Sequence, residues 1–257
     1  MVAHRGASHD NAEHTLGAYV AALDAGAEGL ECDVRLTADG HLVCVHDRDL
    51  RRTASQARAV STMELAELSE LDVTSWKNPW AELDDEAPDR DESLDRVLTL
   101  RRLLEKVADY ERPVEVAIET KHPTRYAGLV EKRLVEMLRD FGWDRTGSPV
   151  RVMSFSFTAL QRVERLAPDV RLVQLIDRAQ YWPMLRRAIG KDWIVGPGID
   201  ELREHPKLGA RLAKSAHDIH VWTVNTPEDL QLCIDLGVKA VITDRPKLLL
   251  ELLADQE

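Results

Sequence analysis

The chain has 257 residues, of which 44% are hydrophobic and 31% are charged, enough to bury the core of one large domain or two small ones. Its formal net charge of -11 argues against non-specific nucleic-acid binding, which draws most of its affinity from Lys and Arg side chains that neutralise phosphates. An anionic ligand must therefore be held by a local cluster of cations or by a metal ion.

Patterns typical of strands and helices alternate along the whole chain. Strands are predicted at Val2–His4, Gly29–Leu36, Leu42–His46, Val114–Thr120, Val150–Phe155, Arg171–Ile176, Trp193–Gly196, Ile219–Val224 and Ala240–Thr243. Helices are predicted at Thr15–Ala25, Leu94–Ala108, Leu129–Phe141, Thr158–Leu166, Trp182–Ile189, Leu208–Ala216, Pro227–Leu236 and Pro246–Ala254. Such alternation indicates βαβ units and a parallel sheet.

The strand Leu42–His46 is one too many for an eight-stranded barrel, and its position explains why. The segment 37–41 that precedes it is too short for a parallel crossover, which needs about a dozen residues or more. It contains Asp39-Gly40, a strong hairpin signal, so this strand should run antiparallel to Gly29–Leu36. The remaining strands predict an α/β fold, a TIM-type (β/α)8 barrel that forms a single domain over residues 1–257.

The interval 48–93 lacks strong periodicity over much of its length. It holds a helical piece at Thr62–Leu71 and an acidic run at Glu82–Glu92. Long loops in compact domains are usually functional or disordered. We therefore expect a small insertion at the mouth of the barrel.

The compartment is predicted from cysteines and from apolar runs. Three cysteines, Cys32, Cys44 and Cys233, form no C-x-x-C motif, which argues against a disulfide framework. The first ten residues lack the basic start and apolar core of a signal peptide, and no apolar run approaches the roughly 18 residues needed to span a bilayer. A cytoplasmic protein without an integral membrane segment is expected.

Four short motifs fall at predicted strand ends or beside the hairpin: His4-Arg5-Gly6, Glu31-Cys32-Asp33, His46-Asp47 and Glu119-Thr120-Lys121. The C-terminal ends of barrel strands are where active sites sit. Residues two apart share a face of a strand, so Glu31 and Asp33 lie on one side of their strand, and Glu119 and Lys121 lie on one side of theirs. A hairpin turn centred near Asp39-Gly40 would also place Asp33 opposite His46.

Glu31, Asp33 and Glu119 would be costly to bury together without a cation. Ligands that are all oxygen atoms suit Mg²⁺ or Ca²⁺ better than Zn²⁺ or copper. A divalent metal beside a phosphate group would account for these carboxylates together with two histidines and two cationic side chains, His4, His46, Arg5 and Lys121.

The order of these motifs resembles the glycerophosphodiester phosphodiesterase family. The resemblance spans nearly the whole predicted barrel and is carried by residues 4–8, 12–15, 25–34, 36–40, 45–47, 52–53, 118–121, 153–155, 221–225 and 242–246. Families of this type also carry a small helical insertion after the His-Asp strand, which matches 48–93. The chain departs from the family's usual pattern at residues 12–15: it has Ala12-Glu13-His14-Thr15 where the family usually has Pro-Glu-Asn-Thr.

The resemblance implies a set of roles by position. Glu31, Asp33 and Glu119 would hold one divalent metal ion, Mg²⁺ or Ca²⁺, and His4 and His46 would be the acid/base pair. The remaining implied roles concern the substrate: Arg5 and Lys121 would grip the phosphate oxygens, and Trp222 would line the glycerol side. The implied reaction is metal-dependent hydrolysis of small glycerophosphodiesters to sn-glycerol 3-phosphate and an alcohol.

Several alternatives stay open at this point. His4 is taken as the base and His46 as the acid, but the two roles could be exchanged. The nucleophile is water or the glycerol 2-hydroxyl of the substrate. Rival functions are a phospholipase D- or C-like phosphodiesterase acting on lysophospholipids and a non-catalytic phosphodiester-binding barrel. The head-group preference is undetermined, as is the choice between a monomer and a homo-oligomer.

Overall fold

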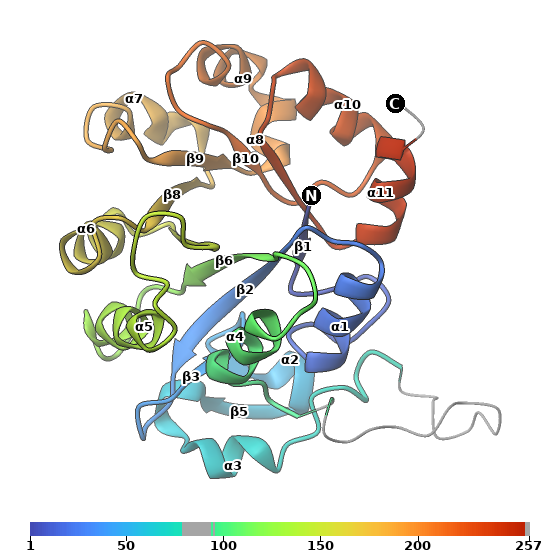
Figure 1. Cartoon of the computed structure of the whole chain (residues 1–257), viewed down its shortest axis with the longest axis vertical. Coiled ribbons are helices and arrows are strands. Elements are labelled where there is room, and N and C mark those ends of the chain that lie inside the picture. Colours follow the sequence, from blue (N-terminus) through green and yellow to red (C-terminus); the bar gives the residue numbers. More distant parts are fainter. Residues whose placement is uncertain (79–93, 95, 255–257) are drawn as a thin grey trace.

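The computed structural model describes residues 1–78, 94 and 96–254 of the chain. Eight parallel strands form a nearly closed barrel with helices around its outer side (Figure 1). Around the barrel the strands follow the order β10 (His220–Val221), β11 (Ala240–Thr243), β1 (Val2–His4), β2 (Gly29–Leu36), β6 (Glu115–Thr120), β7 (Val150–Ser154), β8 (Arg171–Ile176) and β9 (Ile194–Pro197). Two parallel bridges, Val195 to Ile219 and Gly198 to Trp222, connect the ends of this order. The predicted TIM-type fold is confirmed.

Alternation along the strands separates two apolar layers. Residues such as Cys32 and Ile118 pack outwards into the large core beneath the helices. Ala117, Met153 and Val173 turn inwards and fill the barrel. Because side chains alternate along a strand, a residue one position from an outward one faces the barrel axis.

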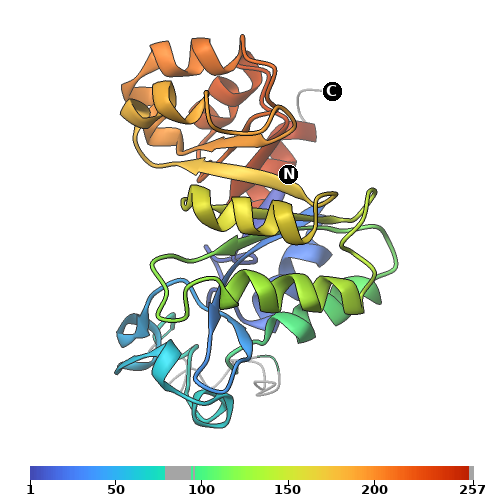
Figure 2. The same cartoon turned by 90° about the vertical axis from the view of Figure 1, so that its left-hand side faces the viewer.

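Four of the outer helices begin where a polar side chain caps them. Thr15, Thr99, Ser156 and Thr226 each accept a hydrogen bond from a first-turn backbone N–H, which satisfies an otherwise unpaired donor. Figure 2 shows two of the outer helices, α5 and α6, side by side. The outer helices are α1 (Leu16–Asp24), α4 (Leu100–Ala108), α5 (Leu129–Asp140), α6 (Phe157–Leu166), α7 (Trp182–Leu185), α8 (Ile199–Glu204), α9 (Pro206–Leu212), α10 (Pro227–Asp235) and α11 (Pro246–Ala254).

Three helix predictions need correction. The helix predicted from Leu94 begins only at Leu100, because Thr99 caps it, and the one predicted for Trp182–Ile189 ends at Leu185. The prediction at Leu208–Ala216 missed α8 altogether. Pro206 lacks a backbone N–H and suits a first helical turn, so the segment divides into two short helices.

The hairpin strand is antiparallel, as predicted, but its register is shifted by one residue. β3 spans Leu42–Cys44 and pairs Val34 with Cys44, so Asp33 faces Val45 rather than His46. The loop holds three residues and ends at Gly40, whose φ is 87°. A three-residue hairpin loop typically ends on such a left-handed glycine, and this moves the turn centre to Asp39.

After β3 the chain forms a small unit at one side of the barrel, seen below β2 and β3 in Figure 1. Its apolar side chains form a separate core that includes Val45, Leu50, Val60 and Met63. Residues 79–93, which include the predicted acidic run, lie outside the described part of the chain. The elements of this unit are β4 (Asp49–Leu50), α2 (Arg51–Ala54), β5 (Gln56–Ala59), the 3₁₀ helix η1 (Val60–Thr62) and α3 (Leu65–Ser69).

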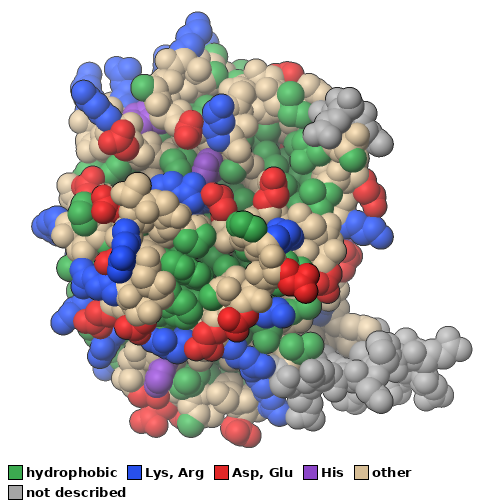
Figure 3. All heavy atoms as spheres, viewed as in Figure 1, with side chains coloured by type: hydrophobic (Ala, Val, Ile, Leu, Met, Phe, Trp, Pro, Cys, Tyr) green, Lys and Arg blue, Asp and Glu red, His purple; other side chains and the backbone are tan. Residues whose placement is uncertain are grey.

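Cys32, Cys44 and Cys233 are free and buried. Figure 3 shows acidic and basic side chains interspersed over the face that it draws. None of the described helices has the length and apolar content required to cross a bilayer.

Candidate active site

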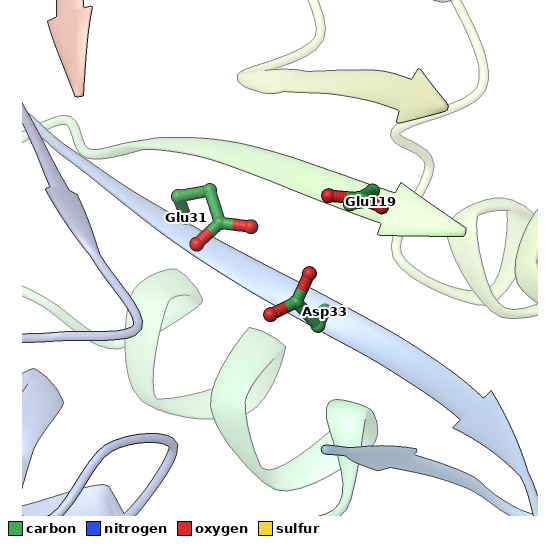
Figure 4. A group of neighbouring side chains, drawn as sticks. All are labelled: Glu31, Asp33 and Glu119. Carbon is green, nitrogen blue, oxygen red and sulfur yellow. The ribbon is translucent and has the colours of Figure 1, made fainter. Parts of the chain in front are cut away.

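Three carboxylates meet inside the barrel, at the level where β1 and β6 end beside the longer β2. Glu31 and Asp33 project from the inner face of β2, and Glu119 projects from β6, where it is the register partner of Asp33. Each can offer one oxygen such that the three atoms lie within 4.8 Å of one another. Figure 4 shows the carboxylates turned toward a common centre. All three side chains are buried, so this cluster needs positive charge nearby.

Two cationic side chains supply part of that charge. The Lys121 Nζ lies 3.1 Å from Asp33 Oδ1 and 2.8 Å from Glu119 Oε1. The Arg5 Nε lies 3.1 Å from Asp33 Oδ2, and the Arg5 backbone N–H donates to Glu31 Oε2. The other Glu31 oxygen, Oε1, is buried and finds no hydrogen-bond partner in the described chain.

The pKa values of the three acids are driven apart. Burial and the charge of Asp33 raise the pKa of Glu119 to about 8 and that of Glu31 well above its ordinary value. Burial would also raise the pKa of Asp33, but the His14 hydrogen bond and the Lys121 charge outweigh it and hold that pKa well below its ordinary value. Without a cation, the cluster therefore keeps protons on some of its carboxyls near neutral pH.

These residues fit a divalent metal ion. Three carboxylate oxygens within reach of one centre are the donor set that Mg²⁺ and Ca²⁺ prefer. The unpartnered Glu31 Oε1 would otherwise carry the cost of a buried polar atom without a hydrogen bond.

His4 is fixed by a carboxylate from the far end of the chain. Its Nδ1 lies 2.7 Å from Asp244 Oδ1, and Asp244 also accepts hydrogen bonds from Ser8 Oγ and Asn225 Nδ2. Burial raises the pKa of Asp244, yet the bonds from His4 and Asn225 outweigh it and lower this pKa below its ordinary value. Asp244 is therefore a carboxylate at neutral pH and accepts from the Nδ1–H of His4, which leaves Nε2 for chemistry.

His46 has a similar carboxylate partner. Its Nδ1 lies 2.8 Å from Asp47 Oδ1, and the other Asp47 oxygen accepts from Arg52 Nε. The Arg35 guanidinium donates Nε–H and Nη2–H to the His46 carbonyl and so fixes the backbone at this residue. Burial is the largest effect on the pKa of His46, and together with the positive charges of Arg5 and Lys121 it lowers that pKa against the opposing charge of Asp33.

The loop after β1 is held by Glu13. This carboxylate accepts from Arg5 Nη1 at 3.1 Å and from both terminal nitrogens of Arg52. Burial raises its pKa, but the hydrogen bonds from Arg52 and the charge of Arg5 prevail and lower the pKa to about 2. Glu13 thus connects Arg5 to the helix that carries Arg52.

His14 contacts the carboxylate cluster directly. Its Nε2 lies 2.9 Å from Asp33 Oδ2, and its Nδ1 lies 2.8 Å from the hydroxyl of buried Tyr19. That hydroxyl also lies 3.1 Å from the Glu31 carbonyl oxygen. Burial is the largest effect on His14 and lowers its pKa. A neutral ring donates Nε2–H to Asp33 and accepts the Tyr19 hydroxyl proton at Nδ1, so His14 fixes the orientation of Asp33.

A pocket of about 230 Å³ opens over this assembly. It is lined by His4, Arg5, Glu31, His46, Glu119, Lys121 and Trp222, among others. The Trp222 indole donates to the Gly196 carbonyl and packs edge-to-face against Phe155 with ring centroids 5.5 Å apart. We call this cavity the catalytic pocket.

The model of the glycerophosphoryl diester phosphodiesterase family matches residues 4–248. The chain belongs to this family. A relative named "Probable glycerophosphodiester phosphodiesterase 1" from Mycobacterium tuberculosis is 43% identical over 96% of this chain and 89% of its own length. A glycerophosphodiester phosphodiesterase from Bacillus subtilis is 32% identical over 96% and 84%, respectively. The chain is therefore an enzyme of the phosphodiesterase class.

Solved structures of the family share the fold. A glycerophosphodiester phosphodiesterase from Agrobacterium tumefaciens is 27% identical and superposes with a TM-score of 0.71, covering 96% of each chain. A phosphodiesterase from Oleispira antarctica, solved with the product sn-glycerol-3-phosphate, has a TM-score of 0.79 at 22% identity and covers 98% of this chain and 96% of its own.

All eight residues selected from the sequence come together in this family member. Seven of them line the catalytic pocket, and Asp33 lies beside it in the carboxylate cluster. The supporting residues Asp47, Glu13, His14 and Asp244 are not among those eight. Asp47 directly follows His46 and Asp244 directly follows β11, so the strand-end rule that found the others could have found both.

Gly6→Ala is expected to lower the free energy of unfolding by about 2 kcal/mol or more, measured by chemical denaturation. Gly6 has a φ of 85°, and an added Cβ would lie 2.6 Å from the backbone carbon of Ala18. Gly147→Ala is the matched control, because it has a φ of 83° but nothing within 4 Å. Equal losses in the two variants would show that the contact with Ala18 is unimportant.

Proposed function

We propose that this enzyme hydrolyses glycerophosphodiesters to sn-glycerol 3-phosphate and an alcohol, with one divalent metal ion and two histidines. The observation that carries the proposal is the buried carboxylate cluster between two histidine–carboxylate pairs in one pocket. The Oleispira antarctica neighbour, solved with sn-glycerol-3-phosphate, supports this choice of product.

Glu31, Asp33 and Glu119 would hold the metal ion, Mg²⁺ or Ca²⁺. When bound, such an ion offsets negative charge on the phosphoryl oxygens as that charge grows toward the transition state. Arg5 and Lys121 lie beside the same cluster and would bind the non-bridging oxygens from the protein side. Trp222 would cover the glycerol moiety.

The two histidines would move the protons. With Nδ1–H held by Asp244, the His4 Nε2 makes no hydrogen bond in the described chain and lies 3.9 Å from Glu31 Oε2, so it can accept a proton from the nucleophile, and Asp244 stabilises the resulting imidazolium. His46, when protonated, can give its Nε2 proton to the leaving alkoxide while Asp47 holds Nδ1. The nucleophile is water or the glycerol 2-hydroxyl, and the latter would give a cyclic phosphate first.

The experiment is an assay of the purified protein on glycerophosphocholine and glycerophosphoethanolamine, with added Mg²⁺ or Ca²⁺ and with EDTA. Release of sn-glycerol 3-phosphate that requires the cation is the expected result. Release of choline phosphate would place the cleavage on the other side of phosphorus. Turnover of lysophosphatidylcholine in place of the small diesters would favour the phospholipase-like alternative.

His14→Ala is expected to weaken binding of the metal ion by about 10- to 100-fold, because Asp33 would lose the hydrogen bond that orients it. Isothermal titration with Ca²⁺ measures the change. His14→Asn is the matched comparison, since the family usually has Asn here and an amide can still donate to Asp33. An unchanged affinity in His14→Ala would contradict a role for this contact.

A further inference from the structure

A second cavity, of about 580 Å³, adjoins the catalytic pocket. Lys121 lines both. The other walls come from the end of β2, from the insertion at Ala59–Thr62 and from residues 122–125 after β6. We call it the basic cavity, because four cationic side chains line it: Arg35, Arg48, Lys121 and Arg125.

Arg35 lies on the same face of β2 as the metal-site acids, two residues beyond Asp33. Its Nε and Nη2 donate to the His46 carbonyl at 3.1 and 2.7 Å, so the guanidinium is anchored rather than loose. Its third nitrogen, Nη1, has no partner among the described residues. Burial is the largest influence on the Arg35 pKa and lowers it, against the opposing charges of Asp33, Asp47 and Glu119.

Arg48 and Arg125 are exposed, and within the described chain neither lies within ion-pair distance of a carboxylate. Elsewhere on this acidic protein some exposed arginines have such partners, as Arg58 does with Glu67 and Arg101 does with Asp140, and others, such as Arg186, have none among the described residues. Three guanidiniums that have no ion-pair partner among the described residues line one cavity of a chain with net charge -11, and together they form a local site for an anion.

The position of the basic cavity relative to the barrel indicates which part of a substrate would reach it. Trp222 follows β10 and Lys121 follows β6, and three strands separate β10 from β6 in either direction around the barrel. A diester with its glycerol at Trp222 and its phosphate at the carboxylate cluster extends its other alcohol toward Lys121. Beyond Lys121 lies the basic cavity.

We propose that the basic cavity binds a second phosphate carried by the head group, so that the enzyme prefers glycerophosphodiesters of phosphorylated polyols. This inference rests on the proposed function. A phosphate monoester carries about -1.5 to -2 charges at neutral pH and three acceptor oxygens, which suits several guanidiniums better than a single carboxylate would.

The test compares kcat/KM for glycerophosphoinositol 4-phosphate and for glycerophosphoinositol, which share one polyol, at fixed ionic strength and saturating cation. For the unchanged protein, kcat/KM for glycerophosphoinositol 4-phosphate is expected to exceed kcat/KM for glycerophosphoinositol by a ratio of about tenfold or more, which is the effect of one charge-assisted contact. Arg48→Gln/Arg125→Gln should reduce that ratio at least fivefold. A ratio near one in the unchanged protein, or the same ratio in the variant, would overturn the proposal.

Two controls make the outcome specific. Arg186→Gln/Arg187→Gln removes two exposed charges that do not line the basic cavity, so the ratio should stay at its original value. Cation-dependent cleavage of glycerophosphocholine is measured in parallel. If that cleavage proceeds while the ratio is near one, only the inference about the basic cavity fails; if it is absent, the proposed function fails as well.

Discussion

His4→Ala and His46→Ala should each lower kcat for glycerophosphocholine by about 10²- to 10⁴-fold, the usual contribution of a positioned acid or base. Both imidazoles line the catalytic pocket, and each is oriented by a carboxylate at Nδ1. Metal affinity should stay nearly unchanged, because neither ring belongs to the carboxylate cluster. Steady-state kinetics and calcium titration check both statements.

An activated substrate separates the two roles. The p-nitrophenyl ester of glycerol 3-phosphate releases a phenolate that needs no proton, so His46→Ala should recover most of its loss on this substrate while His4→Ala should not. The lowered pKa of His46 favours its neutral form, which would also suit a base. If His4→Ala recovered on this substrate and His46→Ala did not, the roles of acid and base would be exchanged. His205→Ala, an exposed histidine away from the pocket, is the control and should keep full activity on both substrates.

Removing the cation should lower the melting temperature, and the loss should grow between pH 6 and pH 8. A ligand at a hundred times its Kd stabilises a protein by about 2.7 kcal/mol, roughly 5 °C for a chain of this size. A raised carboxyl pKa contributes stability that is complete below the ordinary value of 4.5 and is lost as pH rises toward the folded value, which is about 8 for Glu119. The metal-free protein therefore weakens across this window.

A bound cation takes the place of the protons on Glu119 and Glu31, so the loaded protein is spared this loss. Asp33 has its pKa below the window and adds nothing to the change. Thermal unfolding with excess Ca²⁺ and with EDTA, at pH 6 and pH 8, measures the difference. Glu119→Gln should reduce the calcium-dependent increase in melting temperature. Equal melting temperatures of the unchanged protein with and without cation would contradict the prediction.

The barrel was predictable because its information is local. Alternating strand and helix patterns identified all eight parallel strands, and the short interval 37–41 identified the antiparallel one. Parallel strands bring their C-terminal ends to one face, so residues as distant as His4 and Lys121 could be assigned to one site without knowledge of their contacts.

The contacts that support the site depend on geometry that the sequence does not encode locally. The hairpin register depends on one residue of loop length. His46 lies in the pocket although it does not face Asp33, because β3 ends at Cys44, two residues before it. The bond between His4 and Asp244 joins residues 240 apart in the chain. His14 lies at the predicted start of a helix, and its contact with Asp33 depends on a left-handed backbone, with a φ of 60°.

The most direct measurement is anomalous diffraction from crystals soaked with Mn²⁺, which accepts the same oxygen ligands as Mg²⁺. A single strong peak bonded to carboxylate oxygens of Glu31, Asp33 and Glu119, between the rings of His4 and His46, is the predicted result. A protein that turns over glycerophosphodiesters with Mn²⁺ while its crystals show the ion elsewhere would contradict the proposed catalytic centre.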